Sequence, residues 1–284
     1  MRTRSWTNIA LLLAVAIVAT AIFLLRDGDR LDPAPLTELE PSAITGFEVQ
    51  YSDNRPELIL RGDGESWRIL EPVNREARSG RIVRILSFLD DRIDACYQRS
   101  EERMTEFGLD APDLTLVVDG VEIEFGDRTA DGRRYVGAGE RLCLVDDVAY
   151  PLLAGGATEI AVLALLPRGE QPIAIEGPTA HAVDPQARDE WEFIEGEGAG
   201  HRWAVRWRSA HLSDFDMDPP DDDHGEIRIE LANGQVQRWR IAAEAGEESD
   251  LILVPEGADY GLVIARDEAA GLVAPPERVE DGLN

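Results

Sequence analysis

Residues 114–125, LTLVVDGVEIEF, contain the strongest structural signal in the chain. Their apolar side chains alternate with polar ones such as Thr115 and Glu124 on both sides of the pair Asp119-Gly120. Alternation with a period of two places the apolar residues on one face of a strand. Asp-Gly between two such runs is typical of a tight hairpin turn. The stretch therefore predicts an antiparallel β-hairpin with one buried face.

The same pattern recurs in the second half of the chain. Ile227, Ile229 and Leu231 alternate with polar residues before Asn233-Gly234, and the alternation then slips by one residue, which predicts a β-bulge. A further pair of strands follows in each half, at 135–145 and 251–265, and each pair precedes a short helical segment, at 147–153 and 267–272. Such internal repetition indicates two copies of one structural unit.

The two copies are expected to differ in their helices. Ile82, Leu86, Leu89 and Ile93 have the spacing of an amphipathic helix packed on a sheet, so the first copy is predicted to have one between 75 and 94. The second copy is shorter in the matching interval, where residues 212–224 are polar and rich in Asp, and this predicts a loop.

A hairpin-like stretch that ends on Trp is also expected in each copy, with Trp67 matched to Trp203. The sequence from Trp203 continues as Trp203-Ala204-Val205-Arg206-Trp207. Alternation of Trp, Val and Trp favours one buried face of a strand. The alternative is a ligand site in which Arg stacks on an indole ring.

The predicted fold class is therefore α+β, with an N-terminal transmembrane helix followed by two tandem antiparallel-sheet meander units, the first covered by an amphipathic helix. The expected divisions are a cytoplasmic tail and transmembrane anchor at 1–25, a linker at 26–40, a first α+β unit at 41–155, a second, helix-poor and β-rich unit at 156–272, and a tail at 273–284.

The transmembrane prediction rests on residues 9–25, IALLLAVAIVATAIFLL, an uninterrupted apolar run. A helix of this length is at the short end of what a bilayer core of about 30 Å requires. Ala19-Thr20-Ala21 has the form of a signal-peptide cleavage site, but the apolar run continues past it to Leu25. We therefore expect an uncleaved signal anchor that holds the chain in the inner membrane as a single-pass protein, with its C-terminal part in the periplasm.

The charge of the chain excludes several partners. Acidic residues number 56 and basic residues 28, which gives a net charge of −28, and every basic residue is Arg. Such a field repels phosphate backbones and anionic headgroups, so neither nucleic-acid binding nor a polybasic membrane patch is expected. The same field predicts stability that rises with salt, as in an exported protein of a halophile.

Several segments of the first copy together resemble one protein family. They are Ser66-Trp67-Arg68-Ile69-Leu70-Glu71-Pro72, Glu106-Phe107-Gly108-Leu109-Asp110-Ala111-Pro112 before Leu114-Thr115-Leu116, and Arg134-Tyr135-Val136. In this order they are similar to bacterial proteins of domain of unknown function 4340. The resemblance covers most of 40–155, whereas the second copy lacks the Phe-Gly-Leu-Asp-x-Pro segment. It implies a single-span envelope protein with integral membrane transporter components as possible partners, and it assigns no catalytic residue.

Candidate metal ligands occur in one segment, where Asp214, Asp216, Asp218 and His224 could supply oxygen and nitrogen atoms to a divalent cation. The calcium-loop pattern fails because Pro219 stands where it requires Gly, and a solvated acidic loop is the competing interpretation. The two cysteines, Cys96 and Cys143, form either a disulfide or two buried thiols. The sequence indicates no catalytic residue and no cofactor.

The functional hypothesis is a non-enzymatic, membrane-anchored periplasmic protein that acts as a scaffold or accessory subunit of an envelope complex of the transporter type. The alternative is a periplasmic module that binds a small molecule or a divalent cation. A third possibility, an envelope hydrolase, requires a His, a carboxylate and a hydroxyl group to meet in one pocket.

Overall fold

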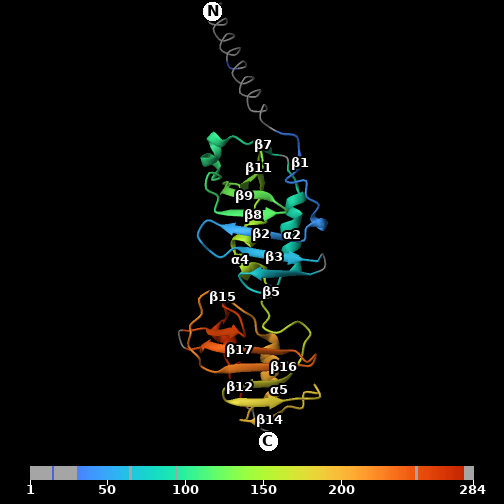
Figure 1. Cartoon of the computed structure of the whole chain (residues 1–284), viewed down its shortest axis with the longest axis vertical. Helices are drawn as coiled ribbons and strands as arrows, with labels where there is room; N and C mark the ends of the chain where they lie inside the picture. Colours follow the sequence, from blue (N-terminus) through green and yellow to red (C-terminus); the bar gives the residue numbers. More distant parts are fainter. Residues whose placement is uncertain (1–14, 16–30, 64–65, 94, 247–248, 278–284) are drawn as a thin grey trace, which may run out of the picture. The chain divides into compact units, whose positions relative to one another are not determined.

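The computed structural model describes Val15 and residues 31–277 except 64, 65, 94, 247 and 248 (Figure 1). The chain divides into two compact units. One comprises Met1–Glu71 and Ala77–Gly156, and the other comprises Pro72–Glu76 and Ala157–Asn284.

The first unit is built on an antiparallel sheet with the strand order β4-β3-β2-β8-β9-β10-β11-β7. These strands are β2 (Gly46–Tyr51), β3 (Leu58–Gly62), β4 (Trp67–Glu71), β7 (Cys96–Gln98), β8 (Leu114–Val118), β9 (Val121–Arg128), β10 (Arg133–Ala138) and β11 (Arg141–Asp146). A separate two-stranded sheet pairs β1 (Ala34–Pro35) with β6 (Arg92–Ile93). The helices are η1 (Pro41–Ala43), α2 (Ser79–Asp90), η2 (Glu101–Phe107) and α3 (Tyr150–Ala154).

The second unit is built on a sheet with the order β14-β13-β12-β16-β17-β18-β19-β15. Its strands are β12 (Pro172–Gly177), β13 (Ala180–Val183), β14 (Glu192–Glu195), β15 (Asp214–Asp216), β16 (Glu226–Leu231), β17 (Val236–Ala243), β18 (Leu251–Pro255) and β19 (Gly261–Ile264), and β5 (Arg75–Glu76) belongs to the Pro72–Glu76 segment. Its helices are α5 (Gly200–Ser209) and α6 (Arg266–Ala269), and α4 (Gly156–Ile160) lies at the division of the chain.

The two sheets have the same topology. In each unit a three-stranded meander leads to a helix, a short strand and a four-stranded meander, and the first strand of the first meander pairs with the first strand of the second. In each unit the last strand pairs with the short strand that follows the helix. The chain therefore contains two copies of one fold, as the repeated hairpins indicated.

The hairpin predicted at 114–125 is present as β8 and β9, with Leu114 opposite Phe125. Asp119 and Gly120 form its turn with φ of +48° and +80°. Positive φ at both central positions is the geometry for which Asp-Gly is preferred. The side chains of Leu114, Leu116 and Phe125 are buried on the inner face of the sheet.

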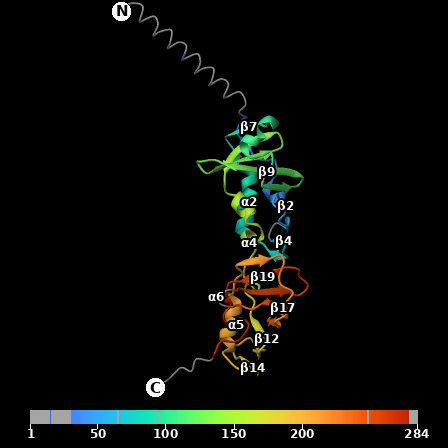
Figure 2. The ribbon, with the colours of Figure 1, turned by 90° about the vertical axis from the view of Figure 1, so that its left-hand side faces the viewer.

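Helix α2 covers one face of the first sheet, and helix α5 covers one face of the second (Figure 2). Helix α2 buries Ile82, Ile85, Leu86, Phe88 and Leu89, largely the face that the sequence predicted. Ile93 lies beyond the helix on β6 and is also buried.

The prediction of a helix-poor second unit was wrong, because α5 occupies the place that α2 has in the first unit. Trp203 and Trp207 lie four residues apart on α5 and are fully buried, whereas Val205 between them is 42% exposed. Buried residues four positions apart lie on one face of a helix and also on one face of a strand. Only the exposure of the residue midway between them distinguishes the two structures. The matching of Trp67 with Trp203 was also wrong, since Trp67 lies on β4.

The prediction of a transmembrane helix is contradicted, and with it the assignment of a single-pass inner-membrane protein with a periplasmic C-terminal part. In the described part of the chain, no helix has the length and apolar character needed to cross a membrane. Crossing a bilayer takes about 20 helical residues, and the longest described helix, α2, has 12. Apart from Val15, the residues 9–25 that carried the prediction lie outside the described residues.

Candidate functional site

The four candidate cation ligands, Asp214, Asp216, Asp218 and His224, are not gathered into a site. Asp214 accepts a hydrogen bond of 2.6 Å from the Thr158 hydroxyl, and Asp216 accepts one of 3.0 Å from the backbone amide of Asp218. His224 is exposed and its backbone amide bonds to β17. Among the described residues, no group of three or more His, Cys, Asp or Glu side chains could hold a metal ion.

The acidic loop is held instead by an arginine of the neighbouring strand. Arg240 on β17 donates through Nη1 to the carbonyl oxygen of Pro220 at 3.0 Å and also to the carbonyl oxygen of Asp222. The backbone amide of His224 donates to the carbonyl oxygen of Ile241 at 3.0 Å. A guanidinium group therefore satisfies the backbone of a loop whose carboxylates face solvent.

Cys96 and Cys143 lie directly opposite each other on β7 and β11 and form a disulfide with an S–S distance of 2.06 Å. Both residues are fully buried. The disulfide excludes these two sulfur atoms as thiolate ligands or nucleophiles while it is intact. A disulfide of this kind persists in an oxidising environment.

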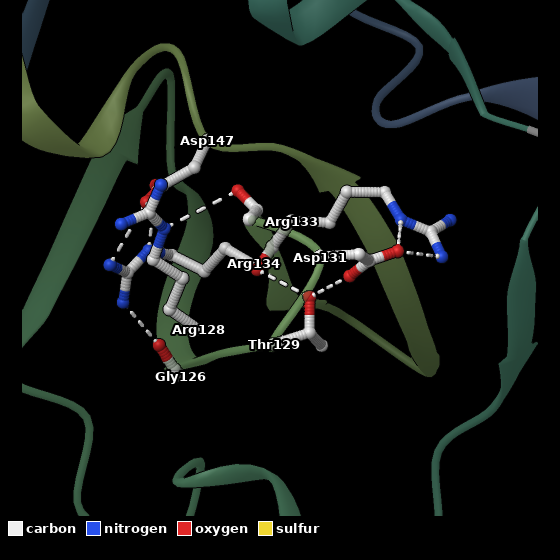
Figure 3. A network of polar contacts seen from close by, with 8 residues as sticks. Gly126, Arg128, Thr129, Asp131, Arg133, Arg134 and Asp147 are labelled. Carbon is white, nitrogen blue, oxygen red and sulfur yellow. Dashed lines mark hydrogen bonds and ion pairs between the residues drawn. The ribbon is translucent and has the colours of Figure 1, made fainter.

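The first unit also contains a network of polar contacts between arginine and aspartate side chains (Figure 3). Arg134, which is 9% exposed, binds both carboxylate oxygens of Asp147, at 2.8 and 3.2 Å, and donates to the carbonyl oxygen of Gly126 at 2.5 Å. Its guanidinium carbon lies 3.5 Å from the centre of the Tyr150 ring. Arg128 also contacts Asp147, at 3.3 Å.

This network holds the irregular end of β9 and β10, where the register shifts between Arg134 and Val136. Figure 3 also shows the adjacent turn, in which Asp131 accepts hydrogen bonds from Thr129 and Arg133. These hydrogen bonds lower the pKa of Asp131, and the bond from Thr129 has the largest effect. Because the partners of Arg134 all belong to the fold, we interpret the network as structural.

The Phe-Gly-Leu-Asp-x-Pro segment is structural as well. The ring of Phe107 packs on Tyr135, with 4.8 Å between ring centres, and Leu109 packs with Met104 and Leu142. Gly108 ends η2 with φ of +67°, a conformation that glycine adopts without strain.

One pocket of the second unit combines apolar groups with two arginines and one carboxylate, that of Glu170. Its walls are the segment between Ala164 and Gln171 and the exposed side of α5, with Val205, Arg208, Ser209 and His211, and its volume is about 450 Å³. We call this the arginine pocket.

Two arginines of the pocket have no side-chain partner in the part of the chain that the structure describes. Neither the Arg168 nor the Arg208 side chain forms an ion pair or hydrogen bond with another described residue. Arg84, Arg92 and Arg188 likewise have no side-chain partner among the described residues, but only Arg168 and Arg208 line one pocket together, where two guanidinium groups suit a carboxylate or another anion. His211 differs, because its Nδ1 lies 4.0 Å from Glu268 Oε1.

The pocket also contains the residue types that a hydrolase would need, but they are not connected as a catalytic set. The hydroxyl group of Ser209 donates to the carbonyl oxygen of Arg206 at 3.2 Å, within its own helix. No hydrogen bond between Ser209 and His211 is present among the described residues. Ser209 and His211 are therefore not arranged as a hydrogen-bonded nucleophile and base in this structure.

Comparison with known proteins adds no assignment: no protein-family model matches the chain, and no curated protein matches it. The resemblance to domain of unknown function 4340 therefore stays a prediction.

Sequence reasoning did not find the arginine pocket. Arg168 follows Leu166-Pro167 in a connecting segment, and Arg208 lies on α5. The signal that the sequence does contain is the group of arginines within 202–208. Interpretation of this segment as a strand hid the fact that these arginines lie on the exposed side of a helix.

Proposed function

We propose that this chain is a non-enzymatic accessory protein that holds a partner protein through the arginine pocket of its second unit. One observation supports this most directly. Arg168 and Arg208, which have no side-chain partner among the described residues, line the same pocket as apolar side chains. Exposed apolar surface rimmed by charge is typical of interaction sites. The resemblance to envelope proteins that accompany transporter components would make such a component the partner.

Crosslinking followed by affinity purification of the full chain from its own cells tests this proposal. The wild-type chain and the variant Arg188→Glu are expected to recover the same partner, whereas Arg168→Glu/Arg208→Glu is expected to lose it. Arg188 is a matched control, because it is an exposed arginine of the same unit outside the pocket. A partner recovered equally by all three proteins would refute the role of the pocket, and recovery of no specific partner would refute the accessory function.

A small-molecule module is a second candidate, because a volume of about 450 Å³ lies in the range of ligand pockets. It predicts that a small apolar carboxylate raises the melting temperature of the wild-type chain but not that of Arg168→Glu/Arg208→Glu. Absence of a shift at millimolar carboxylate would remove this candidate.

A further inference from the structure

The shared topology allows the same position to be compared in the two units. In the first unit, β1 precedes β2 and pairs with β6, which follows α2. The second unit has the corresponding contact as a single antiparallel bridge between Ala164, which precedes β12, and His211, which follows α5. The backbone amide of Leu165 supports this bridge by donating to the carbonyl oxygen of Ala210 at 3.1 Å.

In the first unit the chain that leaves this bridge covers the helix. Leu36 and Thr37 are buried, at 2% and 7% exposure, and the amide and the hydroxyl group of Thr37 both donate to the carbonyl oxygen of Leu89 at 3.2 Å. The 3-10 helix η1 then packs against α2. The end of α2 is thus closed by the unit's own segment.

In the second unit the corresponding region is the arginine pocket. After Leu166 the chain turns outward, and Pro167, Arg168 and Gly169 are exposed. Val205 on α5 keeps 42% of its surface exposed beside the pocket. The Val205 side of α5 is therefore left open here, whereas Arg202 and Arg206 on the same helix donate to the carbonyl oxygens of Glu277 and Ala270 of the unit's own C-terminal segment.

The covering segment of the first unit indicates what chemistry fits such a position. Residues 36–40 read Leu-Thr-Glu-Leu-Glu, with Leu36 buried, Leu39 half-buried, and Glu38 and Glu40 exposed. The arginine pocket offers a partial complement of this pattern, because Val205 supplies exposed apolar surface and Arg168 and Arg208 supply two cations against the single acidic lining residue, Glu170.

We infer that the arginine pocket binds an extended segment of a partner chain in which leucine-like side chains alternate with carboxylates, the chemical equivalent of residues 36–40. This inference rests on the proposed function and specifies its partner. The net charge of −28 limits the segment to a few carboxylates, because a longer polyanion meets repulsion from the rest of the protein.

A defined peptide tests the inference. The probe is a fluorescein-labelled, C-terminally amidated heptapeptide with the sequence of residues 35–41, Pro-Leu-Thr-Glu-Leu-Glu-Pro, and fluorescence anisotropy measures its binding to the full chain at about physiological ionic strength. We expect saturable binding to the wild type and to Arg188→Glu, and a Kd about tenfold higher or more for Arg168→Glu/Arg208→Glu. A peptide with Gln in place of both Glu residues should bind several-fold more weakly.

Further variants test the apolar wall and the folding of the protein. Val205→Asp places a charge on the apolar wall and should weaken binding of the Glu peptide, and thermal melting verifies that each variant is folded. If the double charge reversal Arg168→Glu/Arg208→Glu fails to fold, the single variants Arg168→Gln and Arg208→Gln are tested in its place. Because the peptide could also displace the native segment of the first unit, only binding that depends on the two arginines supports the inference.

The inference is overturned if Glu and Gln peptides bind alike, or if the double reversal binds as the wild type does. Octanoate that competes with the peptide at equal affinity would instead assign the pocket to a small carboxylate, and a dimer lost in the double reversal would assign it to a second copy of this chain. If the peptide fails while a cellular partner still depends on Arg168 and Arg208, the proposed function stands and only this partner chemistry falls. If the peptide binds in the way expected but no cellular partner is recovered, the partner chemistry inferred for the pocket stands and the proposed accessory function falls.

Discussion

Removal of the disulfide should destabilise the first unit and leave the second unaffected. Cys96 and Cys143 are separated by 47 positions in the sequence. On the chain-entropy model, a crosslink that closes a loop of this length stabilises the folded state by about 4 kcal/mol. Strand β7 has only three residues and pairs with β11 at the end of the sheet, so the disulfide is a main attachment of that strand. We therefore expect Cys96→Ala/Cys143→Ala to lose a large part of this stabilisation.

Hydrogen exchange followed by mass spectrometry in a urea series measures the two units separately, which a single spectroscopic transition of a two-unit chain does not. Peptides from β8 to β11 should lose protection at lower urea in the double variant, while peptides from β16 to β19 should keep their midpoint. Wild-type protein under a strong reductant controls for the loss of side-chain volume. A shift of the first unit worth less than about 1 kcal/mol, or an equal shift in both units, would refute the reasoning.

Three further substitutions test other parts of the fold. Trp207→Ala removes a fully buried ring and should cost the second unit about 3–5 kcal/mol in a denaturant titration, whereas Val205→Ala on the same helix should change stability little; equal effects would contradict the orientation of α5. Gly126→Ala places a Cβ 2.2 Å from a backbone oxygen and should lower the melting temperature of the first unit, while Gly80→Ala, where nothing lies within 4 Å, should not. Burial raises the pKa of Tyr51 to about 12, so the folded state favours its neutral phenol; that contribution is complete below about pH 10 and is lost as the pH rises through about 12. The chain has no lysine, and an ultraviolet absorbance titration should show a late phenol that Tyr51→Phe removes; an unchanged titration would show the assignment to be wrong.

The features that sequence reasoning recovered are those that local residues determine. The turn at Asp119-Gly120 follows from the positive φ of both residues, and the face of α2 follows from the spacing of Ile82, Leu86 and Leu89. Repetition of these signals was enough to infer two copies, although the hairpin assigned around Trp203 was wrong. For the Asp-rich segment the sequence left a cation site and a solvated loop open, and in the structure Asp214 and Asp216 of β15 accept hydrogen bonds from separate partners.

The candidate site escaped prediction because it depends on contacts between distant segments. Arg168 and Arg208 come together only because α5 is a helix and because Ala164 pairs with His211 after it. Once the sequence Trp-Ala-Val-Arg-Trp was interpreted as a strand, Val205 was placed on a buried face with the two tryptophans. In the structure it lies on the opposite side of the helix, beside the pocket.

The length of one connection explains why only the second unit has this pocket. In the first unit, residues 36–45 join the bridge strand β1 to β2, and this segment is long enough to form η1 over α2. In the second unit, residues 165–171 join the same two positions and are too short to close the bridge, cover the helix and reach β12. The exposed residues of α5 are polar or charged except for Val205, and Arg168 and Arg208 beside it have no side-chain partner among the described residues. In the proposed complex a partner segment covers Val205 and pairs with Arg168 and Arg208, so the charge reversals and Val205→Asp are the variants that decide it.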